Sequence, residues 1–291
     1  MQKTPDGDSA GRLYAVCKLC GAGDLERHRA HPDLVRCARC GLVFAATRHR
    51  ESDLAAVYQE LYSRAGAYSP HLQELDRLRR GEEVPLGWNR RTLISELRRR
   101  KVRDVAELGA GVGVVARSME RAQGISYVGY EPETETARAA ADAGLAVREG
   151  GWRQMLEAEG AESQDAVIAF EVLEHVQELR ETLEGLRQVL RPGGYLAFSV
   201  PNFDRRLDFE PPDRLHQDPP PIHLNFWNPA SLKRTLELAD FEPVTVRVRT
   251  RPYFEPRRAL ERAPLYWRWL TGRLHGPTLL AIARRKSSTP R

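Results

Sequence analysis

The sequence predicts an α/β protein with a mainly parallel sheet, preceded by a small cysteine-rich module and a helical linker. Three observations lead to this prediction. Strand-type apolar runs alternate with helical patterns from Val102 to Asn202, which is the order of βα units in a parallel sheet. The first of these strands passes through three glycines directly into a helical pattern. All four cysteines stand in two C-x-x-C pairs near the N-terminus.

The cysteine pairs predict a zinc ribbon. Cys17 pairs with Cys20 and Cys37 with Cys40, and each pair is followed by a glycine that lets the backbone fold back toward the sulfurs. Four thiolates at this spacing are typical of a structural zinc site with a closed coordination sphere. Two disulfides are the alternative, and the cytoplasmic location that we expect disfavours them.

The chain divides into five predicted parts. They are a disordered tail (1–11), the zinc ribbon (12–47), a helical linker or cap (48–100), the α/β domain (101–286) and a second tail (287–291). No run of about 18 apolar residues is present, and the N-terminus lacks the apolar segment of a signal peptide. We therefore expect a cytoplasmic protein without membrane contact, and the oligomeric state stays open.

The glycine-rich turn is the strongest local signal in the α/β part. Gly109, Gly111 and Gly113 follow a buried strand and open a helix, which brings bare backbone and a helix N-terminus close to a ligand. The dinucleotide-binding fingerprint needs a small residue at the position that Val114 occupies here, so a pyrophosphate ligand is disfavoured. Glu107 stands two residues before the first glycine. A glycine-rich turn without a ligand is the alternative.

A second acidic residue ends the next predicted strand, Ile125–Pro132. Glu131 at this position can accept hydrogen bonds from both hydroxyls of a ribose. The alternative is an exposed acid at the start of a helix, where the helix dipole also favours negative charge.

The motifs from Val102 to Asn202 together resemble the class I S-adenosylmethionine (SAM)-dependent methyltransferases. The matching stretches are ELGAGVG, Glu131, the fourth-strand segment FEVLEHV from Phe170 to Val176, and LRPGGYLAFSVPN. The resemblance implies a Rossmann-like seven-stranded sheet whose last strand, Thr278–Arg284, is antiparallel. In this chain the fold would follow the zinc ribbon and the helical linker.

The resemblance also implies a set of SAM-binding residues. They are Glu107, Gly109, Ala110, Gly111, Gly113, Glu131, Pro132, Trp152, Phe170 and Glu171. The chain departs from the family pattern after the third strand, where a common aspartate is missing from Glu149-Gly150-Gly151-Trp152. We predict that Trp152 covers the adenine instead.

Activation of the acceptor is predicted to involve Glu174, His175 and His223, because a hydroxyl must lose its proton to a base or a metal ion. Glu171, Glu174 and His175 would share one face if a helical turn begins there. With His223, their order resembles the divalent-metal set of small-RNA 2′-O-methyltransferases, and ubiquinone-pathway O-methyltransferases have a related E-x-x-E-H. The resemblance implies a possible Mg²⁺ or Mn²⁺ site. The alternatives are a histidine base without metal, or residues that only pack.

The predicted function is SAM-dependent methylation of a small molecule, at an oxygen of a sugar, a phenol or a secondary metabolite. A net charge of +5 and an excess of arginine over lysine leave RNA methylation, with the ribbon as docking module, as a second hypothesis. A third hypothesis is a binding or scaffold protein that keeps an inactive SAM fold. The intact glycines and Glu131 argue against it.

Overall fold

The computed structural model describes residues 11–62, 70–122, 124–205, 217–248, 263–271 and 276–287. The strands are β1 (Leu25–Arg27), β2 (Leu34–Cys37), β3 (Val43–Ala45), β4 (Asp104–Leu108), β5 (Ser126–Glu131), β6 (Val147–Glu149), β7 (Gln164–Phe170), β8 (Leu190–Pro201), β9 (Asn225–Phe226), β10 (Phe241–Val248) and β11 (Thr278–Arg285). The helices are α1 (Glu51–Tyr62), α2 (Pro70–Arg79), α3 (Trp88–Arg99), α4 (Val114–Glu120), α5 (Thr134–Asp142), α6 (Trp152–Glu159), α7 (Leu179–Val189), α8 (Pro229–Leu238) and α9 (Ala263–Leu270), with a 3₁₀ turn η1 (Leu173–His175).

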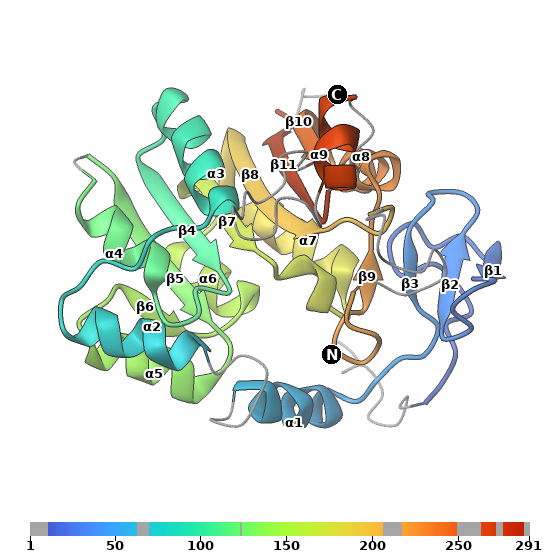
Figure 1. The fold of residues 1–291 in the computed structure, drawn as a ribbon, viewed down its shortest axis with the longest axis horizontal. Helices are drawn as coiled ribbons and strands as arrows, with labels where there is room; N and C mark the ends of the chain where they lie inside the picture. The colour runs from blue at the N-terminus through green and yellow to red at the C-terminus, as the bar shows by residue number, and fades with distance from the viewer. Residues whose placement is uncertain are drawn as a thin grey trace.

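The large sheet has the predicted Rossmann-like form. Its seven strands run in the order β10-β11-β8-β7-β4-β5-β6, and β11 pairs antiparallel with both neighbours while the other pairs are parallel (Figure 1). The last strand is therefore antiparallel, as predicted. The strand order reverses between β4 and its neighbours β5 and β7, which is where open α/β sheets bind ligands at the carboxyl ends of the strands.

Burial explains why the central strands form. The last five residues of β7, from Ala166 to Phe170, are all buried, as expected for a parallel strand covered on both faces. Helix α7 covers one of these faces with Leu179, Leu183, Leu186 and Val189. Figure 1 shows helices on both sides of the sheet.

The four-cysteine region predicted as a zinc ribbon forms a second sheet, and this sheet contains an unexpected strand. Its order is β1-β2-β3-β9, where β9 belongs to the segment between β8 and α8. Residues 203–228 are rich in proline, aspartate and histidine without periodicity, which predicts a long polar loop, but Phe44 pairs with Asn225 and Val43 with Phe226. The ribbon and the α/β part also share one apolar core, which includes Leu42 and Phe44 of the ribbon together with Leu173.

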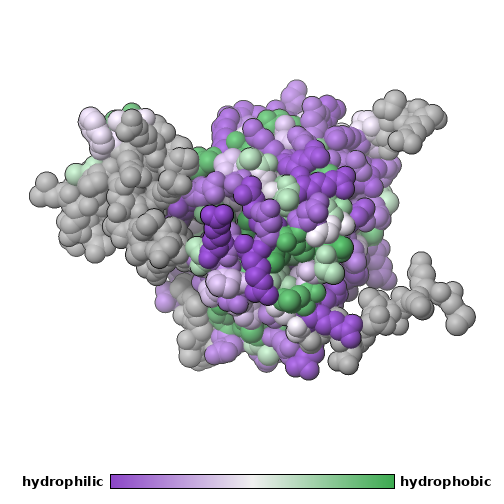
Figure 2. Space-filling model, turned by 90° about the vertical axis from the view of Figure 1, so that its right-hand side faces the viewer, coloured by the Kyte–Doolittle hydropathy of each residue, from purple (hydrophilic) through white to green (hydrophobic). Residues whose placement is uncertain are grey.

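The ribbon lies at one end of the molecule (Figure 1). The face seen from this end is mainly hydrophilic, with smaller hydrophobic areas near its centre (Figure 2). Among the described residues, none of the helices has the length and apolar character needed to span a bilayer.

Candidate active site

The glycine-rich turn leaves β4 in a conformation that glycine adopts readily. Gly109, Gly111 and Gly113 all have positive φ angles, of 73°, 55° and 83°, which cost little without a side chain. The amides of Gly109 and Ala110 both donate to the carbonyl of Tyr130 at the end of β5 (2.8 and 3.1 Å). A Cβ at Gly111 would meet nothing within 4 Å, so this side of the turn is open for a ligand.

Glu131 is held at the end of β5 by backbone amides. One carboxylate oxygen accepts from the amide of Gly111 (2.8 Å), and the other accepts from the amide of Glu133 (3.0 Å). Burial raises its pKa, and these two bonds oppose the rise. A carboxylate has about four acceptor positions, so two remain for hydroxyl groups of a ligand. Pro132, the next residue, is exposed.

Glu107 is buried below the turn and bonds to a neighbouring strand. The hydroxyl of Tyr127 on β5 donates to it, and burial raises the pKa of Glu107 to about 7. Arg90 on α3 opposes that rise through its charge, and its guanidinium lies 5.8 Å from the ring centroid of Phe170. Glu107 and Phe170 were predicted from sequence. Arg90 was missed because nothing in the pattern of α3 separates it from its arginine neighbours.

Glu171 stands apart from the predicted metal set. Its backbone is in the left-handed region (φ 56°), which is unusual for a residue with a side chain. Its carboxylate accepts from the hydroxyl of Ser199 on β8 (2.6 Å). A regular helical turn from Glu171 does not form, because the 3₁₀ turn begins only at Leu173. The structure brings the other three residues of the predicted set together.

Glu174, His175 and His223 converge on one point. Their ligand-type atoms lie within 4.8 Å of one another, and the rings of His175 and His223 are 4.8 Å apart. The Glu174 side chain is 1% exposed, and neither of its carboxylate oxygens has a hydrogen-bond partner among the described residues. Burial raises the pKa of Glu174 well above its ordinary value, and the charge of Glu171 raises it further.

The two histidines present free nitrogens to this point. Nδ1 of His175 is 2.9 Å from the carbonyl of Ile222. A carbonyl only accepts, so Nδ1 carries the proton and Nε2 is the basic nitrogen of the neutral ring. Nδ1 of His223 is buried without a partner in the described part of the chain. Nε2 of His175 lies 4.0 Å from Oε1 of Glu174. One carboxylate and two imidazoles that converge in this way fit a divalent cation.

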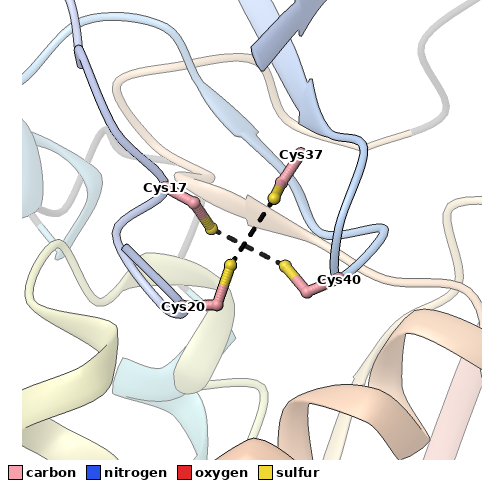
Figure 3. Close-up of side chains that lie close together, drawn as sticks. All are labelled: Cys17, Cys20, Cys37 and Cys40. Carbon is pink, nitrogen blue, oxygen red and sulfur yellow. Dashed lines mark hydrogen bonds between the residues drawn. The ribbon is translucent and has the colours of Figure 1, made fainter. Parts of the chain in front are cut away.

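The four cysteine sulfurs point toward a common centre (Figure 3). Sγ of Cys17 is 3.6 Å from that of Cys40, and Sγ of Cys20 is 3.6 Å from that of Cys37. These distances exclude disulfides, whose sulfurs are about 2.05 Å apart. They are close to the roughly 3.8 Å edge of a tetrahedron with zinc–sulfur bonds of about 2.3 Å. The amides of Leu19 and Cys20 bond to the Cys17 sulfur and help to lower its pKa.

A family model described as a methyltransferase domain matches residues 79–246. The chain belongs to this methyltransferase-domain family. The match covers α3, the glycine-rich turn, Glu131, the η1 turn and His223. All the residues of the candidate active site described above therefore lie inside the family domain, whereas the four cysteines precede it.

Two curated relatives and one solved structure illustrate the similarity. The chain is 32% identical over 143 residues to a probable S-adenosylmethionine-dependent methyltransferase of Mycolicibacterium smegmatis, covering 48% of this chain and 52% of the relative. It is 33% identical over 107 residues to the mitochondrial ubiquinone biosynthesis O-methyltransferase of Homo sapiens, covering 34% of this chain and 28% of the relative. The chain thus spans about half of the first relative and less than a third of the second. The [4+2]-cyclase SpnF superposes with a TM-score of 0.54 at 18% identity, over 81% of this chain and 97% of that chain, which shows the fold alone.

Trp152 was predicted to cover the adenine of SAM, but its ring has protein neighbours in the structure. Its ring packs against Gly185 of α7, where a Cβ would come within 2.1 Å of Cε3. The guanidinium of Arg153 lies 4.6 Å from its centroid. The ring is therefore engaged between α6 and α7, and its contact with adenine stays a prediction.

Proposed function

We propose that the protein transfers a methyl group from SAM to an oxygen atom of a small-molecule acceptor. Phenols, sugars and secondary metabolites are the acceptor classes that we favour. The observation that carries this proposal is that a candidate SAM site and a candidate proton-accepting site lie next to each other beside Gly109. The open glycine turn and Glu131 lie on one side, and the turn that carries Glu174 and His175 begins beside Val172, which a Cβ at Gly109 would touch at 2.4 Å.

On the first side, the backbone of the glycine turn and Glu131 would hold SAM. The two free acceptor positions of Glu131 suit the ribose hydroxyls. Arg90 offers a cation for the carboxylate of the methionine part. Transfer breaks the bond between sulfur and the methyl carbon and forms a bond from that carbon to the acceptor oxygen. Positioning of the two reactants supplies much of the rate in such a displacement.

On the second side, Glu174, His175 and His223 would remove or stabilise the acceptor proton. A divalent cation such as Mg²⁺ or Mn²⁺, if held by these three residues, would bind the acceptor oxygen and lower its pKa. His175 would orient the site through its bond to Ile222. Without a cation, the free Nε2 of His175 is the group best placed to take the proton. Similarity to an O-methyltransferase over a third of this chain supports oxygen as the methylated atom.

The four cysteines would bind one structural zinc ion. Four thiolates complete a tetrahedral sphere and leave no position for water or substrate. The chemistry of the ribbon is therefore separate from that of the Glu174 site.

The first test is ligand binding and methyl transfer. Calorimetry should show SAM binding and no binding of NAD, and labelled SAM should pass its methyl group to a member of a panel of catechols, sugars and short RNAs. His175→Ala should lower turnover by about 10²–10⁴-fold with unchanged SAM affinity. His28→Ala, a ribbon histidine outside the site, is the control. SAM binding without transfer to any acceptor would favour the inactive scaffold.

The second test separates a metal mechanism from a histidine base. Electron paramagnetic resonance of added Mn²⁺ should report binding to wild-type protein and weakened binding to His223→Ala. Turnover should be lost with a chelator that leaves the ribbon zinc in place, and restored by Mn²⁺. Chelator-resistant turnover that still needs His175 would identify the base mechanism.

RNA is the second candidate acceptor, and a cationic groove favours it. A cavity of about 430 Å³ between α3 and α4 is lined by four arginines and one acid: Arg91, Arg98, Arg117, Arg121 and Glu83. Arg121 pairs with Glu83 and Arg117 with Glu120. Neither Arg91 nor Arg98 has an ion-pair partner within the described ranges of the chain. If RNA is the acceptor, its affinity should fall steeply with salt concentration, and Arg98→Glu should weaken it. Salt-independent transfer to a small molecule would exclude RNA.

A further inference from the structure

The ribbon contacts the candidate active site through β9. This strand is bonded to β3, the ribbon strand that follows the second cysteine pair, and the amide of Ala45 donates to the carbonyl of Leu224 (3.1 Å). His223 immediately precedes this pairing. The ribbon therefore fixes the backbone from which one of the three converging side chains projects.

The same segment also holds the turn that carries the other two side chains. The amide of Leu224 donates to the carbonyl of Glu174 (2.6 Å). The side-chain nitrogen of Asn225 donates to the carbonyls of Leu173 (2.8 Å) and Val176 (2.7 Å). The carbonyls of Leu173 and Glu174 in the η1 turn, and that of Val176 directly after it, are thus bonded by two adjacent residues, Leu224 and Asn225, at the start of β9.

A second set of contacts runs from the ribbon to the residues after η1. Nζ of Lys18, inside the first cysteine pair, donates to the carbonyl of Val176 (3.3 Å). The side chain of Gln177 bonds to both the amide and the carbonyl of His49 (2.7 and 2.8 Å). Arg48 and Glu178 form an ion pair at 2.6 Å. One of these contacts comes from the ribbon itself and the others from residues 48 and 49, which directly follow it, and all meet on one short stretch, 176–178.

From these contacts we infer that the four-cysteine ribbon positions the η1 turn for catalysis, and that Asn225 is the main positioning residue. The inference rests on the proposed role of Glu174, His175 and His223. A three-residue 3₁₀ turn has few bonds of its own, here the amide of His175 to Val172 (3.0 Å) and that of Val176 to Leu173 (3.4 Å). Its outward carbonyls need partners, and the ribbon side supplies them. Displacement by about 1 Å would cost about 100-fold in rate.

Asn225 suits a test because its amide nitrogen makes both bonds. The residue is 0% exposed, and its side-chain oxygen has no partner among the described residues. Asn225→Asp keeps the shape of the side chain but replaces the donor by an acceptor. The carbonyls of Leu173 and Val176 then keep only their longer bonds, from the amide of Val176 (3.4 Å) and from Nζ of Lys18 (3.3 Å). Gln177→Leu is a milder second variant, because it breaks only the contact to His49. Phe241→Leu, in the shared core on β10, is a destabilised control away from the turn.

The readout is amide hydrogen exchange on the full zinc-loaded chain, together with Mn²⁺ and SAM affinity. In Asn225→Asp we expect exchange over residues 172–178 to rise at least about tenfold. Mn²⁺ affinity should fall by a similar factor while SAM affinity stays unchanged. Gln177→Leu should show a smaller change of the same kind, and Phe241→Leu none in this segment. Cys37→Ser should raise exchange in 172–178 as well as in the ribbon.

Two results would overturn the inference. One is unchanged exchange over 172–178 in both Asn225→Asp and Cys37→Ser. The other is increased exchange with unchanged Mn²⁺ affinity and turnover, which would make the contact structural only. Failure of the proposed function looks different: wild-type protein would bind no Mn²⁺ and His175→Ala would keep full turnover, so no catalytic role would be left for the ribbon to support.

Discussion

Glu107 and Glu131 are buried carboxylates at the ends of adjacent strands, and they differ in their hydrogen-bond partners. Glu131 accepts from two backbone amides, whereas Glu107 accepts from the hydroxyl of Tyr127. Backbone amides fix a carboxylate rigidly and leave its outer acceptor positions for a ligand. Burial raises the pKa of Glu107 to about 7, and the hydrogen bond from Tyr127 opposes this rise.

Glu107 should make stability depend on pH. Its pKa rises from 4.5 in the unfolded chain to about 7 on folding, because it is buried. The folded protein therefore binds this proton more tightly, and its contribution to stability is full below pH 4.5 and lost as pH rises to 7. Between pH 5 and pH 8 the loss amounts to about 2 kcal/mol. Urea denaturation of Glu107→Gln should lack this loss, and Glu120→Gln on the surface of α4 should retain it. Equal pH dependence in wild type and Glu107→Gln would contradict the assignment.

Alanine substitutions at Gly109 and Gly111 should have different effects, the first mainly on stability and the second mainly on SAM binding. Alanine at either position costs about 1–2 kcal/mol through the left-handed backbone. At Gly109 the added Cβ would also lie 2.4 Å from Cγ2 of Val172, whereas at Gly111 it would meet no protein atom within 4 Å. We expect Gly109→Ala to be the less stable variant in thermal unfolding. Gly111→Ala should instead lose SAM affinity in calorimetry, because SAM would occupy that space. Equal stability and intact SAM binding in both would refute this assignment.

At the scale of secondary structure, helices α6 and α7 pack closely where Trp152 meets Gly185. Trp152 begins α6, and its ring fills the space above Gly185, in the middle of α7. Glycine lowers the helix propensity of α7, and the indole ring occupies the space that a side chain would need. The interface therefore depends on the large ring of Trp152 lying opposite a residue that has no side chain, Gly185.

Gly185→Ala should destabilise the protein although alanine favours a helix. The propensity gain is about 1 kcal/mol, and the Cβ would lie 2.1 Å from the Trp152 ring, so overpacking of about 1–3 kcal/mol outweighs it. The double variant with Trp152→Leu should recover most of the loss. Chemical denaturation measures both. If Gly185→Ala alone is more stable than wild type, the ring does not pack as described. Unchanged SAM affinity in Trp152→Leu would show that the ring has only a packing role.

At the scale of the whole molecule, the ribbon and the methyltransferase-family fold share one core and one strand. β9 comes from the family domain and lies in the ribbon sheet, and the apolar side chains of both parts form one cluster. Zinc binding is coupled to the folding of its ligands. Loss of zinc is therefore expected to affect both parts together.

Purified protein should contain about one zinc per chain, and Cys37→Ser should lose it. We expect a single unfolding transition that shifts to lower temperature when zinc is lost, and early proteolytic cuts in both 12–47 and 217–228. Elemental analysis, thermal unfolding and limited proteolysis measure these effects. A fully folded zinc-free protein with two disulfides would contradict the proposed site, and cuts confined to 12–47 would contradict the coupling.

The sequence by itself determined the parts whose chemistry is local. The glycine turn, Glu131 and the four cysteines each depend on spacing within a few residues, so the pattern identifies them. Apolar runs likewise predicted the alternating strands and helices from Val102 to Asn202, and the family resemblance implied the antiparallel last strand. These features need no knowledge of which distant segments meet.

Only the tertiary structure decided which distant residues meet at the site. β9 has two residues, too few for any periodicity to reveal, and its pairing with β3 joins positions about 180 apart in the chain. Glu171 bonds to Ser199 on another strand and has a left-handed backbone, neither of which its sequence position reveals. Arg90 and Asn225 take their places through packing of α3 and the ribbon sheet. Such contacts form because many side chains from distant segments are buried together, and no local sequence pattern reveals which segments these are.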